Sequence, residues 1–385
     1  MSNRATPIAT AVIDAEGPRM LPAAMRQAGR AVLRAMPEPG FVIAFVSAPD
    51  GLEAGAAEGL CDVLGETVGG ARLVVETVSV VGDAGSREGL SAVSLMAFAR
   101  GVFEIEAETV MASEDPIEVF SALRDARQKA LRGEPRRPRG WMAFLGKKLH
   151  HGAALAALRE TAGLPMVGAA AATLALGAAG AAGRACDAVI LPLRTALGVS
   201  VATAQSFLRK TPWLAVTGLD DGAVASLEGR AALDVVGEVE VAAPAIGPTL
   251  LAIEGPDEAT LLVRTVSSVD AAKRSLRVAE PIGVGQRVSL GLRDPELARA
   301  QLAAQLDGLL RARRSNAPAA VLMLSCAGRG SGFYGQRDVD AGAVRARWRV
   351  PLAGAHVLFE ISPVEGRGAS LQLCAAVVML FDRPS

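Results

Sequence analysis

The sequence predicts a mixed α/β (α+β) protein of two domains, each a largely buried β-sheet flanked by helices. Three observations lead to this fold class. Short apolar runs without alternation, at residues 41–47, 321–324 and 371–381, are typical of strands covered on both faces. Segments at residues 21–36 and 295–311 are amphipathic with the spacing of helices. Apolar residues make up 51% of the 385 residues, enough for a sizeable core.

The remaining elements follow in chain order. Helices are expected at residues 55–64, 116–131 and 152–162, and strands at residues 72–81, 90–97, 102–110 and 141–145. In the strand predicted at residues 102–110, Glu104, Glu106 and Glu108 recur at every second position. This period places the three carboxylates on one face, and we interpret them as a solvated edge rather than a catalytic group.

The expected division is a first domain at residues 1–163, whose sheet continues to about residue 236, and a second domain at residues 237–385. A turn with proline or arginine, a short apolar strand and then a small residue recur at residues 39–47, 138–146 and 318–326. We hypothesise that this recurrence reflects duplication. Neighbouring strands that connect in different orders around the three strands would refute it.

Composition argues against several classes of partner. The 40 basic and 40 acidic residues balance, so no nucleic-acid partner is expected. Residues 166–183 are uncharged, but alanine and glycine insert poorly into a bilayer and no membrane partner is expected. The four cysteines lack a Cys-x-x-Cys pair and the start lacks a signal peptide, which together favour a cytoplasmic protein. The basic, proline-rich residues 132–140 are interpreted as a solvated loop rather than a dock for an acidic partner.

No metal or cofactor is expected. The adjacent residues His150 and His151 would face different ways, and no second cluster of ligands lies at metal-binding spacing. The chain has no phosphate-binding Gly-x-x-x-x-Gly-Lys-Ser motif, and its Gly-x-Gly-x-Gly segment at residues 328–332 lacks the rest of a dinucleotide-binding pattern.

The apolar run at residues 321–324 leads directly into a glycine-rich segment. Glycine allows positive φ angles and close approach of another surface, so the segment is a candidate pocket wall. The alternative is a purely structural glycine-rich hairpin with a buried cysteine. The segment carries a thiol, a guanidinium and two aromatic rings: Cys326, Arg329, Phe333 and Tyr334, the only tyrosine in the chain.

Residues 325–330 (SCAGRG), 333–335 (FYG), 351–354 (PLAG) and 359–363 (FEISP) resemble the C-terminal domain of the FIST family. Residues 164–170, 211–217 and 227–236 are also similar to the family pattern. Phe359 stands where the family usually has glycine. The first half resembles the family more loosely, because residues 76–82 replace a turn rich in Gly, Cys and Ser.

The resemblance implies a FIST N plus FIST C domain protein, a sensory protein that binds a small ligand such as an amino acid and signals through a separate partner protein. An arginine would then pair with a ligand carboxylate, and Glu360 with an amine. The alternative for each arginine is a structural ion pair. The candidate ligand-binding residues are Arg264, Cys326, Gly328, Arg329, Gly330, Phe333, Tyr334, Gly335, Gly354 and Glu360.

Two other functions stay open from the sequence. In a cysteine-dependent hydrolase or transferase, Cys326 would be the nucleophile, His356 its base and Glu360 the orienting carboxylate. In a protein-interaction scaffold there would be no small-molecule site. The sensory interpretation assigns no catalytic residue.

Overall fold

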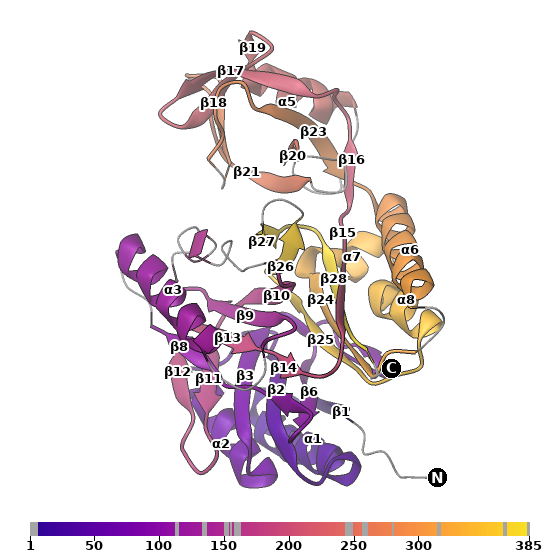
Figure 1. Cartoon of the computed structure of the whole chain (residues 1–385). Coiled ribbons are helices and arrows are strands. Elements are labelled where there is room, and N and C mark those ends of the chain that lie inside the picture. The colour runs from indigo at the N-terminus through magenta and orange to yellow at the C-terminus, as the bar shows by residue number, and fades with distance from the viewer. Residues whose placement is uncertain are drawn as a thin grey trace.

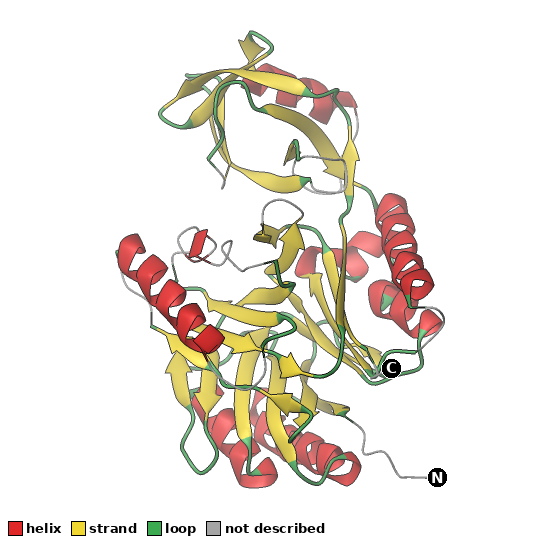
Figure 2. Ribbon diagram, in the orientation of Figure 1, coloured by secondary structure: helices red, strands yellow, loops and turns green. Residues whose placement is uncertain are grey.

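The structure is a computed structural model that describes residues 7–111, 115–132, 137–149, 154, 156–157, 163–242, 249–255, 261–278, 281–313, 317–364 and 368–382. Figure 1 shows a body built on three six-stranded sheets and, above it, a separate barrel. In Figure 2 the helices of the body, in red, lie outside its strands. The predicted mixed α/β class is confirmed.

The first repeat, residues 8–99, supplies four strands of the first sheet, which has the order β1-β6-β2-β3-β11-β12. Its helix α1 buries residues 21, 24, 25, 28 and 32, which share one side of a helix. A Cβ at Gly29 of α1 would lie 2.8 Å from Thr67 Cγ2, so glycine lets α1 and α2 approach. The elements are β1 (Ile8–Ala15), η1 (Pro18–Met20), α1 (Leu21–Ala35), β2 (Pro39–Ser47), α2 (Ala56–Val68), β3 (Ala71–Thr77), β4 (Ser79–Gly82), β5 (Gly85–Ser86) and β6 (Ser91–Ala99).

The second repeat, residues 108–192, builds the sheet β27-β26-β10-β9-β13-β8. The strand expected at residues 102–110 is instead two short strands with Glu106 between them, and β7 (Phe103–Glu104) pairs with β14 (Arg194–Thr195). His150, His151 and residues 133–136 of the basic loop lie outside the described residues, as does most of the helix expected at residues 152–162. The elements are β8 (Glu108–Val110), α3 (Pro116–Arg132), β9 (Trp141–Gly146), β10 (Met166–Ala171), β11 (Leu174–Gly177), β12 (Arg184–Cys186) and β13 (Ala188–Pro192).

The third repeat, residues 199–381, builds the sheet β15-β28-β24-β25-β4-β5 and contains the barrel as an insertion. Its helix α6 begins with Asp294 as N-cap, whose carboxylate accepts the Leu297 amide at 2.7 Å, followed by Pro295. The elements are β15 (Val199–Ala204), α6 (Pro295–Ala312), β24 (Ala320–Cys326), η3 (Ala327–Arg329), α7 (Ser331–Tyr334), α8 (Val339–Arg347), β25 (Leu352–Val357), β26 (Phe359–Val364), β27 (Gly368–Gln372) and β28 (Ala376–Phe381).

The three repeats have the same strand order. Each sheet contains the first, last, second and third main strands side by side, as β1-β6-β2-β3, β8-β13-β9-β10 and β15-β28-β24-β25. In each repeat the last two strands of this order, β2–β3, β9–β10 and β24–β25, are parallel, and the other neighbours are antiparallel. The strands therefore connect in one order around all three recurrent segments, which supports the duplication hypothesis.

A hairpin from each repeat extends the sheet of another repeat. The pair β4–β5 of the first repeat adds to β25 of the third, β11–β12 of the second adds to β3 of the first, and β26–β27 of the third adds to β10 of the second. The exchange is cyclic. The predicted division at residues 163 and 237 stays a prediction, and three of the sheets, the barrel included, contain strands from both sides of residue 237.

The inner faces of the three sheets share one apolar core. Phe45, Phe144 and Leu324 belong to this core and occupy the same register in the parallel pair of each repeat. Three further cores lie between a sheet and its outer helices. Figure 1 shows these outer layers as α1 and α2 at the bottom, α3 at the left, and α6 and α8 at the right. Among the described residues, no helix has both the length and the apolarity needed to cross a bilayer.

The barrel connects β15 to α6. Its strand β23 pairs with both β17 and β20, so six strands close in the order β17-β18-β22-β21-β20-β23. One core fills it together with α5. The elements are β16 (Phe207–Arg209), β17 (Leu214–Asp220), β18 (Ala223–Leu227), β19 (Arg230–Ala231), α5 (Ala232–Ala242), β20 (Leu250–Ile253), β21 (Leu262–Asp270), β22 (Ser275–Val278) and β23 (Arg287–Arg293).

Candidate functional site

The glycine-rich segment after β24 lines an open cavity of about 340 Å³. A Cβ at Gly330 would lie 2.7 Å from Glu88 Oε2, and one at Gly328 would lie 3.1 Å from Arg293 Nη1. Glycine thus allows the ends of two charged side chains to approach this loop closely, as the sequence suggested for a pocket wall. The lining residues are Glu88, Arg293, Ala327, Gly328, Gly330, Ser331, Gly332 and Phe333.

Glu88 and Arg293 are the charged residues of this lining, and the sequence did not single them out. Glu88 Oε2 accepts the Ser331 amide at 2.7 Å. Burial would raise the pKa of Glu88, but hydrogen bonds from the amide and hydroxyl of Ser331 outweigh it and the pKa is lowered. The Arg293 guanidinium carbon lies 4.2 Å from the centre of the Phe333 ring, and Nη2 donates to the Gly328 carbonyl. A carboxylate and a guanidinium from other parts of the chain therefore line the cavity beside one glycine-rich loop.

Arg329 and Tyr334 do not line the cavity but converge beneath it on the buried Asp340. Arg329 Nε donates to Asp340 Oδ2 at 2.8 Å and Nη2 donates to Oδ1 at 3.0 Å. Tyr334 Oη donates to Oδ1 at 2.8 Å, and Ser325 Oγ donates to Oδ2 at 2.7 Å. The structural ion pair that the sequence left as an alternative is what the geometry shows for Arg329. Gly335, with a φ of 71°, caps the C-terminus of α7, the short helix that carries Tyr334.

The partners of Asp340 favour its ionised form despite its burial. Desolvation would raise the pKa of Asp340, but the Arg329 guanidinium outweighs it and holds the pKa below its usual value. Desolvation opposes the charge of Arg329 too, yet Asp340 raises the pKa of that guanidinium. Burial and the Asp340 charge both raise the pKa of Tyr334, so its hydroxyl stays a donor. The network fixes the loop that carries the cavity.

Two other predicted residues lie away from the cavity. Arg264, on β21 of the barrel, donates from Nη1 to the carbonyls of Val263 and Leu371, at 2.9 and 3.1 Å. It therefore ties the barrel to the hairpin β26–β27. Gly354 is buried in β25, where a Cβ would lie 1.8 Å from the Met323 carbonyl oxygen, so its role is packing between β24 and β25.

Cys326, Glu360 and Cys374 form a buried cluster behind the loop. Interaction with Cys374, together with burial, raises the pKa of the Cys326 thiol. The same interaction lowers the pKa of Cys374. Glu360 is fully buried, neither carboxyl oxygen has a hydrogen-bond partner of good geometry, and desolvation raises its pKa well above the usual value.

His356 does not serve Cys326 as a base. Its Nδ1 lies 2.5 Å from Ser79 Oγ, and its backbone is paired with Ser325 in the sheet. Burial lowers the pKa of His356. The arrangement of Cys326, His356 and Glu360 that a hydrolase would need is therefore not assembled, because the imidazole is bonded to Ser79 in another repeat's hairpin.

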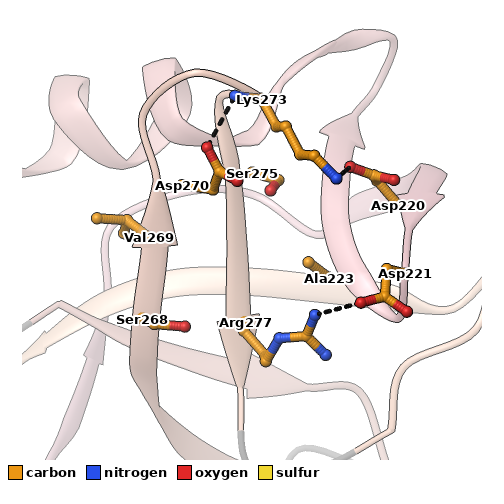
Figure 3. A pocket seen from close by; sticks show the side chains of 9 residues that line it. All are labelled: Asp220, Asp221, Ala223, Ser268, Val269, Asp270, Lys273, Ser275 and Arg277. Atoms are coloured by element: carbon orange, nitrogen blue, oxygen red, sulfur yellow. Dashed lines mark hydrogen bonds and ion pairs between the residues drawn. The ribbon is translucent and has the colours of Figure 1, made fainter.

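A second pocket, of about 220 Å³, lies between two turns of the barrel (Figure 3). Its cations already have partners, since Lys273 Nζ lies 2.8 Å from Asp220 and Arg277 Nη2 lies 3.3 Å from Asp221. Exposed pairs of this kind contribute little, and the pocket offers a ligand no unpartnered cation among the residues drawn. The part of the chain that the structure describes holds no group of three His, Cys, Asp or Glu side chains suited to a metal.

Comparison with known proteins gives one family match. An uncharacterized protein of Mycobacterium bovis is 27% identical over 131 residues, 34% of each chain, and one of Mycobacterium tuberculosis is 25% identical over 180 residues, 43% of this chain and 47% of that protein. The chain thus spans about a third to a half of the length of the curated relatives it matches. A crystal structure of chorismatase aligns over 97% of this chain and 98% of its own, with a TM-score of 0.31 and 10% identity. Residues 232–363, from α5 of the barrel to β26 of the body, match the model of the FIST C domain.

Proposed function

We propose that this chain is a sensory protein that binds a small polar metabolite with both a carboxylate and an amine, such as an amino acid, in the cavity beside the glycine-rich loop. The FIST C domain, which is a sensory signal-transduction domain, supports the sensory role. The observation that carries the ligand class is the presence of Arg293 and Glu88 in one lining. A guanidinium binds carboxylate through two parallel hydrogen bonds, and an ionised carboxylate binds ammonium.

The two charges replace those that the sequence suggested. Arg329 is committed to Asp340, and Glu360 is buried behind the loop, so neither faces the cavity. Arg293, by contrast, lines the cavity, and its Nε is buried with no hydrogen-bond partner. The volume of about 340 Å³ suits a small metabolite rather than a nucleotide.

The position of the cavity also provides a route for a signal. Arg293 ends β23 of the barrel, Glu88 follows β5 of the first repeat, and the glycine-rich loop belongs to the third repeat. A ligand held by both charges would tie the barrel to the body and change their relative freedom. A separate partner protein would read that change. A cytoplasmic location is part of the proposal, since all four cysteines are free thiols.

A thermal-shift and calorimetric screen of amino acids tests the proposal. A binding amino acid at a hundredfold excess over its Kd should stabilise the chain by about 2.7 kcal/mol. The matching amine without a carboxylate and the N-acetylated acid should both bind more weakly, because each lacks one of the two charges.

Variants at the two charges make the test specific. Arg293→Met and Glu88→Gln should each weaken binding by about tenfold to a hundredfold, the size expected for one charged hydrogen bond. Arg277→Met, which breaks the exposed pair with Asp221, is the matched control and should leave binding unchanged. A screen without any stabilising zwitterion, or binding that survives both cavity variants, would favour the scaffold function instead.

A further inference from the structure

One face of the hairpin β26–β27 is polar although it is buried. Side chains along a strand alternate between the two faces of a sheet, and Ile361 and Leu371 face the apolar core that includes Val119 and Leu123 of α3. The residues that alternate with these face the other way and are 0% or 1% exposed: Glu360, Ser362, Ser370 and Gln372. Burial of four such residues on one face is unusual, because these residue types are mostly exposed.

The four side chains form a compact group, which we call the hairpin patch. Across the hairpin, Glu360 pairs with Gln372, and Ser362 pairs with Ser370. Directly opposite residues have Cβ atoms about 4.5 to 5.5 Å apart, and residues two apart on one strand are separated by about 7 Å. Oxygens from several of these side chains can therefore reach one small ligand.

Three side chains of the hairpin patch lack a partner among the described residues. Both carboxyl oxygens of Glu360 and the hydroxyl oxygens of Ser362 and Ser370 are buried without a hydrogen bond of good geometry. Gln372 differs, because its Oε1 accepts a hydrogen bond from Gln205 Nε2 at 2.9 Å. Buried polar atoms are normally hydrogen-bonded, so four unpartnered oxygens on one face need an explanation.

The other two repeats show that the fold does not require a polar residue here. In each repeat one hairpin residue pairs with an equivalent position of the neighbouring strand. These positions are Val75, Ala169 and Ala355, and their hairpin partners are Leu174, Glu360 and Val80. Leu174 and Val80 belong to the apolar core that the three sheets share. Glu360 therefore stands where an aliphatic residue serves the fold, and its carboxyl points to a ligand.

We infer that the hairpin patch binds one monovalent metal cation, sodium or potassium, through Glu360, Ser362 and Ser370. Carboxylate and hydroxyl oxygens are hard ligands of the kind that hard cations take. The face of the hairpin that carries them lies against the third repeat, since β26 contacts β15, β24 and β28. The cation would therefore lie between the second and third sheets.

The charge of the hairpin patch selects a monovalent ion. Glu360 is its one carboxylate. The buried pair of Arg329 and Asp340 in the same repeat is neutral as a whole, because the two groups bond each other at 2.8 Å. A single positive charge therefore neutralises the patch, whereas a divalent ion would leave an uncompensated charge in the interior.

Complete burial restricts the occupant to a single small species. A water molecule would give the hydroxyls a partner but would not balance an ionised carboxylate, so the carboxyl of Glu360 would keep its proton. A cation replaces that proton and binds the carboxylate and both hydroxyls together. Cation and water therefore differ in whether stability depends on the identity of the salt.

The hairpin also supports the barrel. Arg264 of β21 donates to the Leu371 carbonyl at 3.1 Å. Gln205, in the linker between β15 and β16, donates to Gln372 and to the Leu261 carbonyl of the barrel, at 2.9 and 3.0 Å. A cation that fixes the hairpin would also stabilise these contacts with the barrel.

Equilibrium unfolding of the full chain by urea tests the inference, in chloride salts of sodium, potassium, calcium and choline at equal ionic strength. Choline is too large for an enclosed site and controls for screening. At a hundredfold excess over its Kd, sodium or potassium should shift the folding equilibrium about a hundredfold relative to choline. Calcium should have no greater effect than choline.

Variants of the hairpin patch locate the ion. Glu360→Leu copies the equivalent residue of the second repeat, Leu174, and should fold with equal stability in all four salts. Ser362→Ala/Ser370→Ala keeps the carboxyl and should weaken cation binding at least about tenfold. Asp221→Asn is the control, because Asp221 lies with other carboxylates in the pocket at the barrel turns, the rival place for a cation. This variant should keep the full salt effect.

Equal stability of the unaltered chain in all four salts would overturn the inference and would mean that the hairpin patch holds water. A cation effect that survives in the hairpin variants, or that is lost in Asp221→Asn, would place the ion elsewhere. The serine variant decides this point if Glu360→Leu does not fold. A larger effect of calcium would refute the monovalent charge. Binding of amino acids is measured separately at constant salt, so these results do not bear on the proposed function.

Discussion

The first and third repeats share one strand order but differ at the end of their parallel strands. The register places Ser47 of β2 and Cys326 of β24 at the same position, opposite Thr77 and Val357. In the first repeat, Ser47 Oγ donates to the Leu90 carbonyl at 2.9 Å. In the third, the Cys326 amide donates to the Ala375 carbonyl at 2.8 Å, and the fully buried Glu360 interacts electrostatically with Cys326. Apolar residues thus form the buried strands of both repeats, and a few polar residues at the strand ends distinguish the third repeat.

The largest expected difference between these two repeats is in their ion pairs. Arg329→Met should lower the free energy of unfolding by about 3–5 kcal/mol, because it leaves the Asp340 charge buried without its partner. In the first repeat, Arg87→Met removes an ion pair with Asp14, in which the side chains are 18% and 55% exposed, and should cost about 0–1 kcal/mol. Urea unfolding of both variants measures the difference. Equal losses would mean that the Asp340 network does not set the third repeat apart.

Glu360 should give the third repeat its own dependence on pH. Burial raises the pKa of Glu360 in the folded chain, whereas an unfolded glutamate has a pKa of about 4.3. Between these two pKa values the folded chain binds more protons than the unfolded chain. Stability should fall as pH rises through this window, by about 1.4 kcal/mol per pH unit. Glu360→Gln should abolish this slope and be more stable than wild type at the upper end. Parallel unfolding curves for the two proteins would contradict the prediction.

The smallest effect concerns the contact between the repeats. Gly330→Ala places a Cβ 2.7 Å from Glu88 Oε2, and should displace Glu88 from the Ser331 amide and weaken zwitterion binding. The stability cost should be about 1 kcal/mol, since the end of Glu88 is flexible. Gly332→Ala is the matched control, because a Cβ there meets nothing within 4 Å. Melting temperatures and calorimetry on both variants check this, and a larger loss in the control would show that the loop rather than Glu88 matters.

The sequence was informative where structure depends on local pattern. The buried strands at residues 41–47 and 321–324, the helix at residues 295–311 and the glycine-rich loop were all predictable from spacing. The duplication was visible only as a recurrent apolar segment, because strand order depends on contacts between distant residues.

The site was predictable only in part for the same reason. Gly328, Gly330 and Phe333 lie in the segment that the sequence singled out and line the cavity. Glu88 is 243 residues from Ser331, whose amide it accepts, so no local pattern could show that contact. Nor could spacing show that Arg329 and Tyr334 would bind Asp340 instead of lining the cavity. The sequence around these two residues is the same whether their side chains are exposed or buried.

The cyclic exchange of hairpins has a consequence for how the body assembles. Since every repeat completes a sheet that is not its own, removing any one of them would open an edge on the sheet of a second repeat and leave the hairpin of the third without a sheet to join. Such an interlocked ring should melt in a single transition, and its separate fragments should associate before they become protease-resistant.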